Sequence, residues 1–152
     1  MPRWLLAVFR AMNLVSFRLF GRRMRIQGRP LLLLTTIGAK TGRRRQTTLA
    51  YFPDEERTSE SWLIVASAAG SAAHPSWYVN LARDPRAWIE VDGGERAVRA
   101  ESLHAEERER AWRRVVALAP GYGPYAEKTD REIPIVRLVP REDDRPAPRA
   151  ER

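Results

Sequence analysis

The chain has 152 residues, 43% of them hydrophobic and 30% charged, which is enough for one domain with its own core. It has no cysteine, and its two histidines, His74 and His104, are far apart, so disulfides and thiolate sites are excluded and no metal site is expected. The 27 Lys and Arg residues against 19 Asp and Glu residues give a net charge of +8. This excess of positive charge favours an anionic partner. The candidates are a phosphorylated cofactor, acidic lipid and nucleic acid.

The N-terminal segment predicts an amphipathic helix over residues 3–20, within an N-terminal region that we place at 1–25. Arginines occupy another face, so the helix suits either a membrane interface or the domain core, and the sequence leaves both open. We recognise no secretory signal, and the apolar stretches are shorter than the roughly 20 residues of a membrane span. We therefore expect a cytoplasmic protein, peripheral on the inner face of the membrane if the helix lies there. The apolar face consists of Leu5, Val8, Phe9, Met12, Val15, Leu19 and Phe20.

Short strands are predicted from residue 26 onward. Residues 31–37 form a continuous apolar run between Pro30 and Gly38, which indicates a buried strand, and residues 46–52 pair back on it. A polar connection over 54–60 leads to another buried strand at 62–67. Residues 68–76 are small and include Gly70, which predicts a loop that lets a ligand approach the backbone closely. A short helix is expected over 77–83.

The second half of the chain predicts a hairpin, a helix and a last strand. Residues 87–91 and 96–102 flank Asp92-Gly93-Gly94, a strong hairpin signal, and 133–139 is the last strand. About six short, mostly antiparallel strands must protect their edges, so we predict a mainly β (α+β) domain over 26–140, closed as a barrel or sandwich with helices outside. The charged, Pro-rich tail 141–152 is expected to be disordered. The helix at 106–118 is expected to bury Ala111, Trp112, Val115 and Leu118 and to end before Pro120 and Gly121.

The turn after the first buried strand is strongly cationic. Lys40 lies between Gly38 and Gly42, and three arginines follow at 43–45. It is not a P-loop, because Ala39 rather than glycine precedes Lys40 and a strand rather than a helix is expected afterwards. The turn either exposes N–H groups and cations to one anionic ligand or is a plain β-turn with solvated arginines.

Two aromatic segments could belong to a site. His74-Pro75-Ser76-Trp77-Tyr78-Val79-Asn80 follows the small-residue loop and could frame a flat ring system. The tyrosines of Gly121-Tyr122-Gly123-Pro124-Tyr125 lie on a kinked segment and could stand at the mouth of a cleft, where a phenol donates a proton or a hydrogen bond. The alternatives are that Trp77 belongs to the core, that Asn80 satisfies local backbone, and that the tyrosines are packing residues. His74 and Ser76 do not form a nucleophilic triad, because no carboxylate or oxyanion element accompanies them.

Taken together and in this order, these segments resemble the deazaflavin-dependent nitroreductase family, whose members use coenzyme F420. The resemblance covers residues 31–140 and rests on LLLLTTIGAKTGRRR, on HPSWYVNLARDPRAWIEV, on the pair Tyr122 and Tyr125 and on the closing IPIV. It implies a split β-barrel related to the FMN-binding pyridoxamine-phosphate oxidases. In that fold the deazaflavin ring lies beside the tyrosine segment, and its phosphate and oligoglutamate tail run over basic residues.

The resemblance also implies roles for individual residues. Tyr122 would orient or protonate the acceptor, and Tyr125 would line the same pocket. Ala119 stands where some members carry a further tyrosine, which puts nitroimidazole reduction in doubt and predicts a roomier pocket. Lys40, Thr41, Gly42, Arg43 and Arg45 would hold the phosphate and tail; Ser67, Ala68, Ala69 and Gly70 would face the cofactor through backbone groups; and Pro75, Trp77 and Asn80 would build the adjoining wall.

We therefore expect an oxidoreductase that transfers a hydride from reduced F420 (F420H2) to a quinone, enone or nitroaromatic acceptor. Such an enzyme needs no metal and no nucleophile, because the cofactor carries the hydride. The alternatives are a split barrel that binds FMN or haem and a non-catalytic F420 carrier. Nucleic acid is not an expected partner, because the basic residues are not interleaved with a recognition helix or an aromatic RNA-binding signature. A homodimer is also considered.

Overall fold

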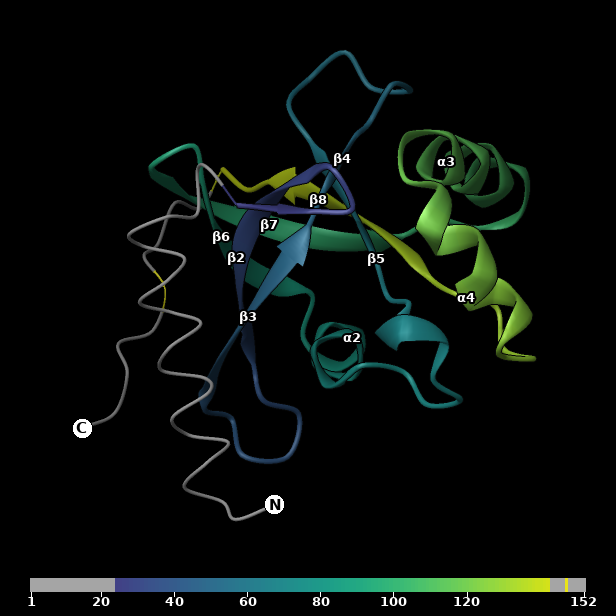
Figure 1. The fold of residues 1–152 in the computed structure, drawn as a ribbon. Coiled ribbons are helices and arrows are strands. Elements are labelled where there is room, and N and C mark those ends of the chain that lie inside the picture. Colours follow the sequence, from purple (N-terminus) through teal and green to yellow (C-terminus); the bar gives the residue numbers. More distant parts are fainter. Residues whose placement is uncertain (1–23, 143–146, 148–152) are drawn as a thin grey trace.

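A curled antiparallel sheet organises the computed structural model, which describes residues 24–142 and 147 (Figure 1). Helices lie outside this sheet, as the predicted split β-barrel requires. The described strands are β1 Arg25–Ile26, β2 Arg29–Ile37, β3 Arg44–Ala50, β4 Phe52–Pro53, β5 Trp62–Val65, β6 Arg86–Val91, β7 Gly94–Ser102 and β8 Ile135–Pro140. The described helices are α2 Ser76–Arg83, α3 Ala105–Leu118 and α4 Gly123–Glu127, with single 3₁₀ turns η1 Ala68–Gly70 and η2 Pro120–Tyr122.

The pairing of β3 and β4 explains how the sheet curls. The sheet runs in the order β1-β2-β6-β7-β8-β5-β4, and every pair of neighbours is antiparallel. β3 pairs along β2, from Ile37 opposite Arg44 to Leu31 opposite Ala50. β4 follows after Tyr51 alone and pairs with β5. Residues 44–53 thus pair with β2 near one end of the sheet and with β5 near the other, so the sheet curls round on itself. This confirms the barrel prediction.

Two hydrophobic cores lie on opposite faces of β5 and β8. Ile64 and Val136 point into the inner core, whereas Leu63 and Ile135 point into an outer core under α3. This separation follows from the alternation of side chains along a strand. The inner core also takes Trp77 and Leu81 of α2, so α2 covers one end of the barrel. The outer core includes Phe52, Ala111, Val115, Ala119, Tyr122 and Ile133.

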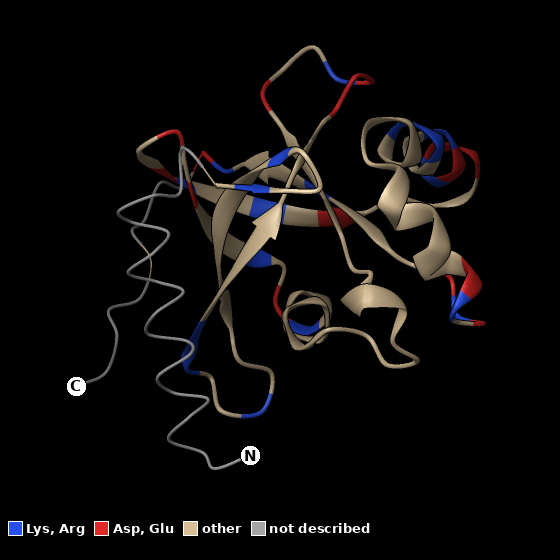
Figure 2. Cartoon of the chain, viewed as in Figure 1, with Lys and Arg blue, Asp and Glu red and all other residues tan. Residues whose placement is uncertain are grey.

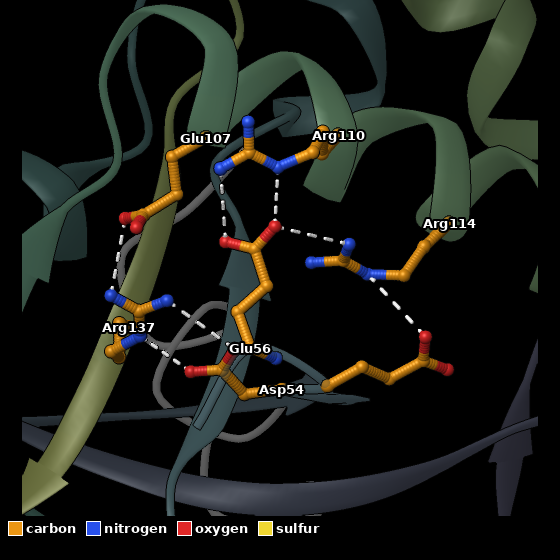
Figure 3. Close-up of polar contacts among 7 residues, drawn as sticks. Asp54, Glu56, Glu107, Arg110, Arg114 and Arg137 are labelled. Atoms are coloured by element: carbon orange, nitrogen blue, oxygen red, sulfur yellow. Dashed lines mark hydrogen bonds and ion pairs between the residues drawn. The ribbon is translucent and has the colours of Figure 1, made fainter. Parts of the chain in front are cut away.

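A network of ion pairs ties the 54–60 connection to α3 and β8 (Figure 3). Arg137 of β8 contacts the fully buried Asp54 carboxylate and, at 3.1 Å, Glu107 of α3. Arg110 of α3 forms a second pair with Glu56. The sequence predicted only a polar connection here. In the structure Arg137 holds it at Asp54 and Arg110 holds it at Glu56.

The predicted elements are confirmed with shifted boundaries and one wrong inward residue. The strand predicted at 46–52 begins at Arg44 and is interrupted at Tyr51, so the described residues form more strands than the predicted six. Leu118 is 44% exposed, because the helix ends there and the chain turns so that Ala119 continues the buried face. Arg108 turns inward instead and donates to the carbonyl of Ile133 from Nε and Nη2 at 3.2 and 2.8 Å.

The helix predicted at 3–20, and with it most of the region 1–25, lies outside the described residues, as does most of the tail 141–152. Within the described part of the chain, no helix combines the length and the apolar character that crossing a membrane demands.

Candidate active site

The cationic turn between β2 and β3 is a tight loop that presents its side chains to solvent. Gly38 closes it twice, donating to the carbonyl of Arg43 at 2.7 Å and accepting from the N–H of Gly42 at 2.8 Å. A Cβ at Gly38 would lie 2.8 Å from Thr41 Oγ1 and 3.1 Å from the carbonyl oxygen of Arg43, so a side chain here would crowd the turn. Gly42 has φ +67°, which glycine adopts without strain. Lys40, Thr41, Gly42, Arg43 and Arg45 are all exposed.

The electrostatic surroundings leave this turn positive. The sequence contains no Asp or Glu from residue 31 to residue 53. None of the ion pairs among the described residues involves Lys40 or Arg45. Figure 2 shows basic residues alone at this hairpin, whereas acidic and basic residues mix on α3 and on the 54–60 connection. The hairpin can therefore direct the positive charges of Lys40 and Arg45 at an anion.

Asn80 fastens the cationic hairpin to α2. Its Oδ1 accepts from the N–H of Ala39 at 2.9 Å, and its Nδ2 donates to Thr36 Oγ1 at 3.1 Å. Arg45 pairs with Thr36 across the strands, so Arg45 lies on the same face of the sheet as α2. Trp77 is 7% exposed in the inner core, and Pro75 is the residue that precedes α2. Of the predicted wall residues, Asn80 contacts the hairpin directly, whereas Trp77 anchors α2 in the inner core.

The loop after β5 contains strained backbone. Ala68 and Ala69 have φ of 45° and 52°, and Gly70 has φ of 80°. Alanines in this region cost about 1–3 kcal/mol each and persist only where the surroundings impose them, often at functional sites. Gly70 donates to the carbonyl of Ser67, but the N–H groups of Ala68 and Ala69 find no acceptor among the described residues. A ligand could therefore accept from these two N–H groups, and the predicted contact of this segment with the cofactor stays a prediction.

The tyrosine segment packs directly against the strained loop. A Cβ at Gly70 would lie 2.9 Å from Lys128 Cβ and 3.0 Å from the carbonyl of Tyr125. Tyr122 is 7% exposed, and its ring contacts Phe52 and Tyr125 edge to face at 5.5 and 5.4 Å. Burial, together with the neighbouring Tyr125, raises the pKa of Tyr122 above its ordinary value of 10.0, so its phenol stays protonated.

Tyr125 is half-buried, and its hydroxyl meets a residue that the sequence did not single out. Gln27, in the turn between β1 and β2, donates from Nε2 to Tyr125 Oη at 3.1 Å. Its amide also lies over Gly121, where a Cβ would approach Gln27 Oε1 to 2.2 Å. Because the phenol oxygen accepts this hydrogen bond, its own hydrogen can be donated elsewhere. The sequence carries no signal for this contact, since 98 positions separate the two residues.

The structure brings all three predicted clusters to one end of the barrel. The cationic hairpin, α2, η1 and α4 follow one another there (Figure 1). A hydrogen bond joins the hairpin to Asn80 of α2, and η1 packs against α4. The arrangement offers cations at one side, free backbone N–H groups in the middle and phenols at the other side. This sequence of donors suits an elongated ligand with an anionic tail and a polar ring.

Comparison with known proteins agrees with this geometry. The family model of the F420H(2)-dependent quinone reductases matches residues 13–140. An F420H(2)-dependent quinone reductase of Mycobacterium tuberculosis is 39% identical over 115 residues, which cover 74% of either chain. A solved F420-H2 dependent reductase aligns with a TM-score of 0.63 and 35% identity over 72% of this chain and 94% of that one.

Another solved structure, described as a domain-swapped dimer, aligns with a TM-score of 0.64 and 30% identity, covering 86% of this chain and 98% of that one. The family model spans most of the chain, and the relatives share both its sequence pattern and its fold. The chain therefore belongs to the F420H(2)-dependent quinone reductase family.

Proposed function

We propose that the cationic hairpin, η1 and the tyrosine segment together bind F420H2 and direct hydride transfer to a quinone. As a member of its family the chain is an F420H2-dependent oxidoreductase of the quinone reductase type, and reduced F420 is its cofactor. The observation that carries the residue assignment is the meeting of these three segments at one barrel end.

The residues present fit this cofactor. A deazaflavin with a phosphate and a chain of carboxylates needs cations spread over some length and hydrogen-bond donors for its ring carbonyls. Lys40, Arg43 and Arg45 supply exposed cations on one hairpin. The N–H groups of Ala68 and Ala69 supply donors that the described residues leave unused. Thr41 and Gly42 form hydrogen bonds within the turn. Asn80 joins the turn to α2, the helix that Pro75 precedes.

The cofactor, when bound, supplies the hydride, and the protein contributes orientation and a hydrogen-bond donor. Hydride and proton addition convert a quinone to a hydroquinone, and negative charge develops on the quinone oxygen during the transfer. A phenol donating to that oxygen stabilises the charge. Tyr125 suits this role, because Gln27 occupies its oxygen and leaves its hydrogen free. Tyr122 packs behind it against Phe52.

Variants of the two tyrosines test this assignment. The sequence predicted the donating role for Tyr122, whereas its burial supports Tyr125 in that role. We expect Tyr125→Phe to slow stopped-flow oxidation of F420H2 by a soluble quinone by about tenfold or more, because one donor to developing charge is lost. The matched variant Tyr122→Phe keeps the ring packing and should change the rate by less than about threefold. An undiminished rate in Tyr125→Phe would contradict the role of Tyr125, and a loss confined to Tyr122→Phe would restore the sequence prediction.

The same assay ranks the acceptors. Quinones fit the family; enones and nitroaromatics remain predictions, as does any effect of Ala119. That residue is 1% exposed in the outer core, so its methyl group contacts protein rather than solvent.

Tighter binding of FMN or haem than of F420 would overturn the proposal, and tight F420 binding without turnover would indicate a carrier. Membrane contact through residues 3–20 and a homodimer also stay predictions; the similarity to a domain-swapped dimer supports testing the latter.

A further inference from the structure

We propose that Arg131 is a positioning residue that holds the loop over residues 66–74 in the shape that receives F420; this rests on the function proposed above. Arg131 lies between α4 and β8 in the sequence, and it contacts the loop across 60 or more positions of the chain. It belongs to none of the motifs on which the family resemblance rests.

Arg131 binds the loop on both sides of η1. Its Nε donates to the carbonyl of Ser71 at 2.9 Å, and its Nη2 donates to the carbonyl of Ser67 at 2.9 Å. Its Nη1 donates to the carbonyl of Ala66 at 3.1 Å and lies 3.2 Å from His74 Nδ1. A rigid, planar guanidinium with several N–H donors can hold separate carbonyls at fixed positions, which a lysine cannot do.

These contacts determine where the free N–H groups point. In a trans peptide the C=O and N–H directions are opposed. Because the carbonyls of Ala66 and Ser67 point toward Arg131, the N–H groups of Ser67 and Ala68 point away from it. The strained conformations of Ala68 and Ala69 need such external restraint to persist. Arg131 thus orients the N–H group of Ala68, one of the two that the proposed site offers to the cofactor.

Arg131 also contacts His74, and it takes part in no ion pair among the described residues. A guanidinium can only donate, so His74 Nδ1 is the acceptor in this contact. The imidazole ring packs against Tyr78 with centroids 4.8 Å apart. Since none of the ion pairs in the described part of the chain includes Arg131, its guanidinium is used for the loop carbonyls and for His74.

The test compares Arg131→Met and Arg131→Lys with Arg110→Met, which releases an arginine that anchors the 54–60 connection instead. F420 binding is measured by fluorescence titration, and amide hydrogen exchange of Gly70 and Ser71 is measured without cofactor. We expect Arg131→Met to raise the Kd about tenfold or more and to speed exchange of both amides by a similar factor. The kcat at saturating F420H2 should change less than about threefold, since binding rather than chemistry is affected. Arg131→Lys should be intermediate, and Arg110→Met should leave the Kd and both amides unchanged.

An unchanged Kd in Arg131→Met would overturn the proposal, and so would faster exchange spread evenly over the strands, because that reports lost global stability. If Arg131→Met does not fold, Arg131→Lys decides by the same criteria. If the wild-type protein does not bind F420, the proposed function fails; the exchange of Gly70 and Ser71 in the cofactor-free variant then supports or overturns the loop-holding role alone.

Discussion

Asn80 is a single residue on which the position of the cationic hairpin depends. Its amide is buried and serves Ala39 and Thr36 at once, across 41 and 44 positions of sequence. Both ends of an amide must find partners when buried, and here the partners belong to the hairpin that carries Lys40. The side chain therefore sets the distance between the hairpin and α2.

Asn80→Ala should release the hairpin. The substitution leaves the Ala39 N–H and the Thr36 hydroxyl without a partner, which costs about 1–3 kcal/mol of unfolding free energy. We expect the KM for F420H2 to rise severalfold with little change in kcat, measured by steady-state kinetics. Gln46→Ala is the matched control, because it removes one hydrogen bond, to Thr35, from the other face of the same strands. A KM equal in both variants would show that Asn80 does not align the site.

Single residues also show where prediction from sequence ends. Asn80 and Gly70 were singled out because an amide and a glycine stand out beside a small-residue loop. Their partners, Thr36 and the backbone of Tyr125, lie in other segments and could not be named. Gln27 and Arg131 were missed altogether, because an exposed glutamine and one arginine among many carry no local signal. Their roles arise only when the fold brings distant segments together.

At the scale of elements, the sequence predicted the turns and the buried strands well, but it predicted less well which side of a helix or strand is buried. Residues 31–37 and the Asp92-Gly93-Gly94 hairpin follow from local patterns and are confirmed, as β2 and as the turn between β6 and β7. Leu118 was expected inside because helical spacing assumes that the helix continues, yet α3 ends at that residue. β5 is apolar throughout and β8 is apolar apart from Arg137 up to Val139, because both strands contact a core on each face.

The 54–60 connection offers an element-scale prediction about acid stability. Burial would raise the pKa of Asp54, but hydrogen bonds from Arg137 and Ser61 outweigh it and hold the pKa below its ordinary value of 3.8. A lowered pKa means that the ionised carboxylate stabilises the fold above that value, and that this stability is lost as the pH falls below 3.8.

Asp54→Asn should therefore lower stability at neutral pH by about 3 kcal/mol, because Arg137 loses a buried partner, and should flatten the decline in acid. Denaturant unfolding at a series of pH values measures both effects. Asp84→Asn breaks a more exposed pair with Arg86 and should cost about 1 kcal/mol or less. An acid decline as steep in Asp54→Asn as in the wild type would refute this account of the network.

At the scale of the whole molecule, the β2–β3 hairpin is one place where positive charge gathers, and residues 1–23 contain five further arginines and no acidic residue. The mixed charges of α3 and the 54–60 connection neutralise one another in ion pairs, whereas the β2–β3 hairpin keeps its cations (Figure 2). Net charge alone allowed lipid, nucleic acid or a cofactor as the partner. The fold narrows this choice, because it places the cations beside free backbone N–H groups and phenols at one barrel end.

Fluorescence titration of F420 against charge-removed variants tests the central claim most directly. Lys40→Ala/Arg45→Ala removes two hairpin cations, and Arg99→Ala/Arg113→Ala removes two exposed cations from β7 and α3. We predict that the hairpin variant stays folded, binds F420 about tenfold or more weakly and loses much of the salt dependence of binding, because charge-assisted contacts to the acidic tail are gone. The β7 and α3 variant should bind almost as the wild type does. Equal weakening in the two variants, or none in either, would contradict the claim that this hairpin holds the cofactor.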